Sequence, residues 1–144
     1  AIGKGVVLAE IQQTSDITYR VYDYNRTDDE GNSRQLHTEE AKEAIDFEAN
    51  DEYKIDYTSK ENNKTSLVEN QYFKTKQIKL SQELTLDYSS TDSFVIYMNI
   101  EGDTKVSTER GDEVLKAGET LLIPACIDEV KITSNNSTLL EVTI

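Results

Sequence analysis

The chain closes, over residues 119–144, with the sequence ETLLIPACIDEVKITSNNSTLLEVTI. It contains three runs of β-branched and other apolar side chains, at 119–123, 130–133 and 138–144. Short groups of turn-forming residues such as Ser, Asn and Asp separate these runs. This pattern predicts three short, half-buried strands joined by tight turns.

The same pattern continues upstream as far as residue 72. Further runs lie at 72–80, 83–88, 94–100, 104–108 and 113–115, each bounded by turn residues. Short strands at close, regular spacing are typical of a sandwich or barrel. We therefore expect a mostly β fold with a β-barrel over residues 66–144.

Upstream of the barrel the pattern changes. Residues 48–66 are rich in charged and amide side chains and carry one short alternating run, at 53–57, which we expect to be a strand. Residues 38–47 have helical spacing, with Thr38 as the expected N-cap. A soft domain boundary is expected near residues 60–66.

Composition excludes several classes of function. The net charge of −13 argues against nucleic-acid binding, which needs clustered Lys and Arg, and against anionic membrane surfaces. No apolar run approaches the ~20 residues that span a bilayer. The single cysteine, Cys126, fits a reducing cytoplasm and is expected to be a small buried hydrophobe rather than a nucleophile.

The first 26 residues, AIGKGVVLAEIQQTSDITYRVYDYNR, concentrate ionisable and aromatic groups on strand-like sequence. Runs at 6–12 and 17–25 flank the turn formers at 14–16. If these runs pair as a hairpin, Glu10 lies opposite Arg20, with Cβ atoms within ~5.5 Å. From the residues alone, Arg20 is better explained as the partner of a cross-strand Glu or of Asp23 than as a functional group.

This segment resembles the catalytic stretch of the type I phosphomannose isomerases, enzymes of the cupin superfamily, in their short bacterial form. The family pattern has Ala-[Ile/Tyr]-x-x-Gly, then a Glu, a Ser-Asp pair and an Arg ten positions beyond the Glu. The matching positions here are Ala1-Ile2, Gly5, Glu10, Ser15-Asp16 and Arg20, with further similarity at 22–26 and 34–37. Residues 118–124, GETLLIP, are similar to the second cupin motif but lack the His that follows it in metal-binding cupins.

The resemblance implies a fold, a reaction and site residues. The expected fold is a cupin/jelly-roll barrel at 66–144, preceded at 1–65 by the last strands of a truncated catalytic cupin domain and one short helix. The expected reaction interconverts mannose 6-phosphate and fructose 6-phosphate. Arg20 and Glu10 are the expected catalytic residues, and Arg26 and Lys4 the expected phosphate contacts.

The resemblance also implies that other parts are needed. The family's zinc ligands match no residue here, so the chain is expected to hold no metal and to need the missing N-terminal half of the same protein as its partner. Alone it should be inactive. The alternatives are a non-catalytic cupin that binds a sugar or mediates oligomerisation, and an unrelated jelly-roll structural protein.

Overall fold

The computed structural model describes residues 3–14, 17–49 and 51–144. It divides the chain into two compact units, Ala1–Asp51 and Glu52–Ile144. Within the described residues there are one helix, α1 (Thr38–Ala44), and nine strands. The strands are β1 (Lys64–Glu69), β2 (Lys74–Leu80), β3 (Leu84–Asp87), β4 (Val95–Glu101), β5 (Thr104–Thr108), β6 (Gly111–Leu115), β7 (Thr120–Ile123), β8 (Glu129–Thr133) and β9 (Ser137–Thr143).

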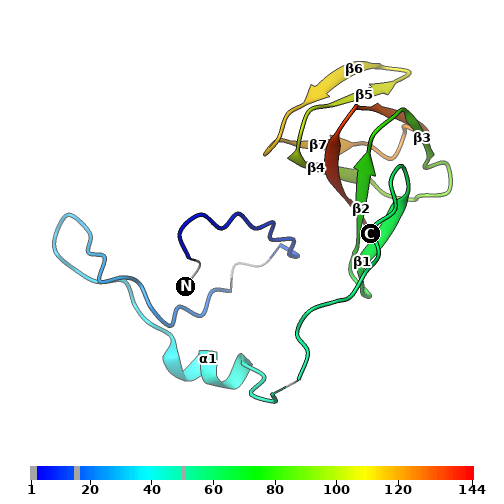
Figure 1. Cartoon of the computed structure of the whole chain (residues 1–144). Helices are drawn as coiled ribbons and strands as arrows, with labels where there is room; N and C mark the ends of the chain where they lie inside the picture. Colours follow the sequence, from blue (N-terminus) through cyan, green and yellow to red (C-terminus); the bar gives the residue numbers. More distant parts are fainter. Residues whose placement is uncertain (1–2, 15–16, 50) are drawn as a thin grey trace. The chain divides into compact units, whose positions relative to one another are not determined.

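The second unit is a two-sheet barrel (Figure 1). One sheet has five strands in the order β1-β2-β9-β4-β7, and the other has four in the order β3-β8-β5-β6. The strand pairs of both sheets are antiparallel, and β9 lies between β2 and β4 although it is the last strand in the sequence. The mostly β fold expected from the sequence is therefore confirmed. Strand β1 begins at Lys64, within the stretch 48–66 that was expected to be a connection.

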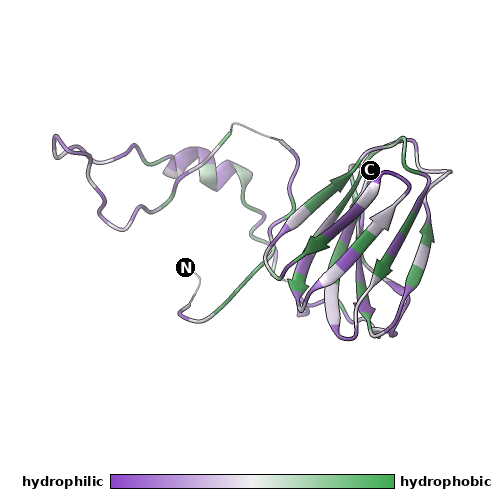
Figure 2. Ribbon diagram, turned by 90° about the horizontal axis from the view of Figure 1, so that it is seen from above, coloured by the Kyte–Doolittle hydropathy of each residue, from purple (hydrophilic) through white to green (hydrophobic). Residues whose placement is uncertain are grey.

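The barrel forms because its strands alternate apolar and polar side chains, a pattern visible along the strands in Figure 2. On β2, Ile78 and Leu80 are buried while Lys79 between them is exposed. The inward side chains of both sheets meet in one core. Its fully buried members include Ile78, Tyr97, Val130, Ile132 and Leu139.

The turn between β4 and β5 requires glycine. Gly102 has φ +71°, and a Cβ there would collide with the backbone carbonyl of Asn136. Beneath the turn, the Asn99 amide donates to the carbonyl oxygens of Gly102 at 2.6 Å and Leu115 at 2.9 Å. This buried amide therefore joins the end of β4 to the end of β6.

The described residues of the first unit contain α1 but no strand. The predicted strands at 6–12 and 17–25 are wrong, because neither run is a strand in this structure. The turn expected at 14–16 falls partly on Ser15 and Asp16, which lie outside the described residues. The prediction of strands at 6–12 and 17–25 failed because a strand needs a second backbone to satisfy its hydrogen bonds, and a hydrophobic pattern alone does not supply one.

Three smaller expectations also need correction. Residues 53–57 form no strand, and the N-cap of α1 is His37 rather than Thr38. Cys126 is exposed, because the turn at Pro124–Ile127 directs Ile127 into the core instead; the Ile127 amide donates to the Pro124 carbonyl at 3.0 Å. None of the described helices is long or apolar enough to cross a bilayer.

Candidate functional site

Residues 20–37 of the first unit form a closed loop, here called the arginine loop. Its ends meet at Arg20 and His37: the His37 amide donates to the Arg20 carbonyl at 2.7 Å, and the Arg20 amide donates to His37 Nδ1 at 3.1 Å. Farther along, an isolated bridge pairs Thr27 with Ser33. Arg20 and Asp23, in the second predicted run, thus lie against residues 34–37.

The sequence of the turn explains this local pairing. The Asp28 carboxylate accepts the backbone amides of Glu30 at 3.0 Å and Asn32 at 2.8 Å. Gly31 has φ +87°, a conformation that favours glycine. Asp followed by Gly three positions on is a strong turn signal, and it closes the loop within one short stretch of chain.

One carboxylate in this loop, that of Asp23, is paired with an arginine. Arg34 forms a bidentate ion pair with Asp23. Its Nε donates to Oδ2 at 2.8 Å, and a terminal nitrogen donates to Oδ1. These hydrogen bonds hold the pKa of the Asp23 carboxyl below its ordinary value against partial desolvation, and the charges of Arg34, Arg20 and Arg26 lower it further. The arginine loop thus holds three of the four arginines of the chain, although its four acidic residues give it a net charge of −1.

Arg20 is half-buried, and its guanidinium donates to the Gln35 carbonyl at 3.2 Å. Arg26 is exposed, and its guanidinium carbon lies 5.7 Å from the centre of the Tyr24 ring. Both arginines named from the sequence therefore belong to the same loop. Asp23 and Arg34 complete the cluster, and the signal that could have assigned Arg34 to it was its place in the matching stretch 34–37.

Glu10 and Lys4 lie outside the arginine loop. Both are exposed, and neither makes a hydrogen bond or ion pair with any described residue. The expected pairing of Glu10 with Arg20 across a hairpin is absent. Among the described residues, the Glu10 carboxylate therefore has no hydrogen-bond partner.

Zinc does not fit the residues at hand. Among residues 3–14, 17–49 and 51–144, no group of three His, Cys, Asp or Glu side chains could hold a metal ion. The one histidine, His37, uses Nδ1 to accept the Arg20 amide. No catalytic step is therefore derived through a metal.

The barrel has a buried ionic cluster that the sequence reasoning missed. Glu141, 1% exposed, accepts hydrogen bonds from Lys64 Nζ at 2.6 Å and from the Tyr88 hydroxyl. The Tyr97 hydroxyl lies 2.6 Å from that of Tyr88, and Lys64 Nζ sits 4.3 Å from the centre of the Tyr88 ring. A glutamate within the apolar run TLLEVTI was the available signal, since a carboxylate there needs a partner.

Comparison with known proteins gives the family. A model described as "Mannose-6-phosphate isomerase, cupin domain" matches residues 63–143, more than half of the chain. The chain belongs to this family. The cupin barrel expected from the resemblance is thereby confirmed.

Relatives extend the similarity beyond the barrel. Mannose-6-phosphate isomerase ManA of Bacillus subtilis is 34% identical over 134 residues, which is 92% of this chain but 42% of that protein. The Streptococcus mutans mannose-6-phosphate isomerase is 29% identical over 88% of this chain and 40% of its own length. The chain thus spans about two fifths of the curated relatives it matches.

Solved structures agree with this assignment. The crystal structure of the B. subtilis mannose 6-phosphate isomerase has a TM-score of 0.71 at 30% identity and covers 90% of this chain and 41% of its own. A cupin-2 domain protein of Shewanella frigidimarina, 15% identical, has a TM-score of 0.51 over 59% of this chain and 82% of its own. The second match supports the fold alone.

Proposed function

We propose that this chain supplies the arginine loop and the C-terminal barrel of a mannose-6-phosphate isomerase, which interconverts mannose 6-phosphate and fructose 6-phosphate. The observation that carries the proposal is that the closed loop 20–37 holds three of the four arginines of the chain, with Arg34 ion-paired to Asp23. An acidic protein that handles a phosphosugar must concentrate its few cations in one place. Relatives named as mannose-6-phosphate isomerases that align with 88–92% of the chain support the same reaction.

Aldose–ketose isomerisation moves a proton between two adjacent sugar carbons through an enediol. The reaction needs a group that takes and returns the proton, and fixed positive charge beside the oxygens that become negative. A guanidinium suits the second role because it stays protonated and presents a planar fork of donors. We assign this role to Arg20.

The surroundings of Arg20 suit that role. Its backbone is fixed by two hydrogen bonds to His37, and its guanidinium donates to the Gln35 carbonyl. A guanidinium has five N–H donors, so several remain for substrate oxygens. The loop thereby holds Arg20 in place without using up its donors.

Glu10, Arg26 and Lys4 take the remaining roles in the proposal. Glu10 lines the pocket and takes part in proton transfer, for which its unpaired carboxylate is available. Arg26 and Lys4 bind the phosphate, which charged donors recognise well. The exposure of Arg26 and Lys4 leaves their cationic groups open to an anion.

The catalytic site is completed by polypeptide that this chain does not span. The first unit supports this view because Ala41 is the sole buried residue among those described in it. We therefore interpret residues 1–65 as the end of a catalytic cupin domain, residues 66–144 as the second barrel, and the 144-residue chain as inactive alone. The zinc implied by the resemblance would be held by the remaining polypeptide.

The test uses a chimera in which this chain replaces the matching segment of B. subtilis ManA. Arg20→Ala should lower turnover of mannose 6-phosphate by at least a hundredfold, because one charge-stabilising donor is worth about that much. Arg110→Ala, which removes an exposed arginine at the β5–β6 turn, is the matched control and should leave turnover unchanged. Equal activity of the two variants would remove Arg20 from its role, and binding of the sugar without turnover in the unmutated chimera would favour the non-catalytic alternative.

A further inference from the structure

The chain reverses direction between Arg20 and Arg26. The Arg26 amide donates to the Asp23 carbonyl at 3.0 Å, which closes a four-residue turn. The two central residues of this turn, Tyr24 and Asn25, have φ angles of +53° and +54°. A positive φ at both central positions is the signature of a type I′ turn. A tight turn therefore lies between the two arginines that the proposed function assigns to the substrate.

The turn shortens the distance between these two arginines. Six fully extended residues would separate Arg20 from Arg26 by ~20 Å, which is longer than a hexose phosphate. Because the Arg26 amide contacts the Asp23 carbonyl, three extended residues, or ~10 Å, separate the two backbones instead. The charges of both arginines lower the pKa of the Asp23 carboxyl, which agrees with this shorter spacing. One sugar phosphate can therefore reach both guanidinium groups.

Tyr24 is an unusual residue for such a turn. Asn25 fits its position, because Asn, Asp and Gly favour the left-handed conformation. An aromatic side chain seldom adopts this conformation. Residues held in sparsely populated backbone conformations cluster at functional sites, where the surrounding structure enforces them. The presence of a tyrosine here therefore points to a role for its ring.

The surrounding loop enforces the turn from both sides. On one side, Asp23 forms the bidentate ion pair with Arg34. On the other side, Thr27 is bridged to Ser33. Residues 24–26 lie between these two anchors. A substitution inside this segment should therefore move its side chains and leave the rest of the arginine loop in place.

The Tyr24 ring contacts a second ring and a cation. The Tyr22 ring lies 4.9 Å away, edge to face. The guanidinium carbon of Arg26 lies 5.7 Å from the centre of the Tyr24 ring, within the range of a cation–π contact. An exposed arginine otherwise samples many rotamers, and restricting them in advance lowers the entropic cost of binding a ligand. The ring can therefore prepare Arg26 for an anion.

We propose that Tyr24 is a positioning residue: its left-handed backbone brings Arg26 near Arg20, and its ring holds the Arg26 guanidinium for the phosphate group of the substrate. The inference rests on the proposed function, because it takes Arg26 as a phosphate contact. Tyr24 acts only through the residue that binds the phosphate. It therefore favours phosphorylated over unphosphorylated hexoses.

The experiment uses the ManA chimera described above and measures two constants, KM for mannose 6-phosphate and the inhibition constant of inorganic phosphate. Tyr24→Asn keeps a residue that favours the left-handed turn but removes the ring. It should raise both constants about fivefold, because Arg26 must then be ordered on binding. It should leave kcat unchanged, because the phosphate is bound equally in the ground and transition states. Tyr24→Phe keeps the ring and should leave both constants at their original values.

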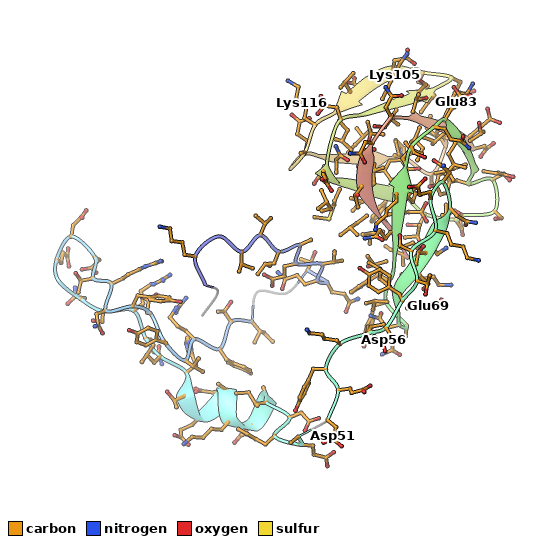
Figure 3. The ribbon with its side chains drawn as sticks, in the orientation of Figure 1. Asp51, Asp56, Glu69, Glu83, Lys105 and Lys116 are labelled. Carbon is orange, nitrogen blue, oxygen red and sulfur yellow. The ribbon has the colours of Figure 1, made fainter. Side chains whose placement is uncertain are left out.

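A double-mutant cycle tests whether Tyr24 acts through Arg26. Arg26→Ala should raise both constants about tenfold, the effect of one charged hydrogen bond, and adding Tyr24→Asn should raise them no further. Additive losses would mean that Tyr24 contacts the substrate itself, which would overturn the inference. Lys116→Ala, which removes an exposed cation that projects from the barrel (Figure 3), is the matched control and should change neither constant.

The remaining outcomes separate this inference from the proposed function. Calorimetric titration with mannose 6-phosphate gives a dissociation constant even for an inactive chimera, so the same cycle can be read from binding. Binding without turnover contradicts the proposed function alone, and an active chimera that Tyr24→Asn leaves unchanged contradicts the inference alone. A chimera that binds no sugar phosphate contradicts both. Loss of folding in Tyr24→Asn but not in Tyr24→Phe would assign the ring to stability and overturn the positioning role.

Discussion

Asp23 shows how a single side chain organises the arginine loop. It binds Arg34 directly and lies within the electrostatic reach of Arg20 and Arg26. Without this carboxylate, three guanidinium groups would repel one another. Asp23 therefore offsets part of this repulsion, and with Asp28, Asp29 and Glu30 it gives the loop a net charge of −1.

The pH dependence of the loop should follow Asp23. The pKa of Asp23 in the folded state lies below the ordinary value of 3.8. The contribution of the Asp23–Arg34 ion pair to the stability of the loop is therefore fully present above pH 3.8, and it is lost as the pH falls through the folded pKa. We expect the NMR signal of the Arg34 Nε–H group to keep its position at pH 5 and to shift only below the ordinary value. In Asp23→Asn the signal should be displaced already at pH 7, and a wild-type shift centred above 4 would contradict the assignment.

Lys64 is the counterion of a carboxylate that is almost fully buried. Replacing it with Met leaves Glu141 charged and unpaired, which should cost about 3 kcal/mol of unfolding free energy. The matched control is Lys74→Met, which removes an exposed pair with Glu69 and should cost less than about 1 kcal/mol. Urea unfolding at pH 7 measures both, and equal losses would mean that the buried pair adds nothing beyond a surface pair.

The two phenols of the same cluster should titrate apart from the other tyrosines. Burial raises the pKa of Tyr88 and of Tyr97 well above the ordinary value of 10.0. The folded state therefore holds these protons more tightly, so stability is complete below about pH 10 and declines as the pH rises beyond it. Ultraviolet titration should show two of the eight tyrosines still protonated when the others have ionised, and full ionisation of the folded protein near pH 10 would refute this.

At the scale of the element, the barrel strands could be predicted and the strands of the first unit could not. Strand β5 was expected at 104–108 and is found there, because alternation and flanking turns fix a strand whose partners are nearby. Strand β1 was missed: its polar sequence, KTSLVE, gives little alternation, and its position depends on pairing with β2 through a bulge. Runs 6–12 and 17–25 have strand-like patterns, but a pattern cannot say whether a partner strand is present.

The candidate site could likewise be predicted only in part from the sequence. Sequence reasoning named Arg20 and Arg26, and both lie in the arginine loop. It did not place Arg34 beside Asp23, since that contact depends on the turn at Asp28. Nor did it find Lys64 beside Glu141, because the two lie far apart in the sequence and only the folded barrel brings them together.

The β4–β5 turn offers a test of backbone geometry. Gly102→Ala combines a positive φ with a collision against Asn136, so it should lower the unfolding free energy by at least about 3 kcal/mol. Gly118→Ala is the control, since Gly118 has φ +86° but open space around its Cβ position, and it should cost about 1–2 kcal/mol. Denaturant unfolding separates the two, and equal losses would show that the collision is relieved by movement of the turn.

At the scale of the whole molecule, the two units differ in how much they bury. The barrel has a continuous core, whereas the described part of the first unit exposes most of its large apolar side chains, among them Val7 at 92% and Phe47 at 72%. Amides in residues 17–49 should therefore exchange with solvent orders of magnitude faster than those of β2, β4 and β9 in the isolated chain. Hydrogen exchange followed by mass spectrometry measures this, and equal protection would mean that the first unit has a core of its own.

The most direct test of the account is turnover of mannose 6-phosphate by the unmutated ManA chimera, followed by NMR as fructose 6-phosphate accumulates. If this chain supplies the arginine loop and barrel of an isomerase, the chimera should turn over within about tenfold of ManA, while the 144-residue chain alone should show no conversion. A chimera that folds cooperatively yet converts no substrate would contradict the account.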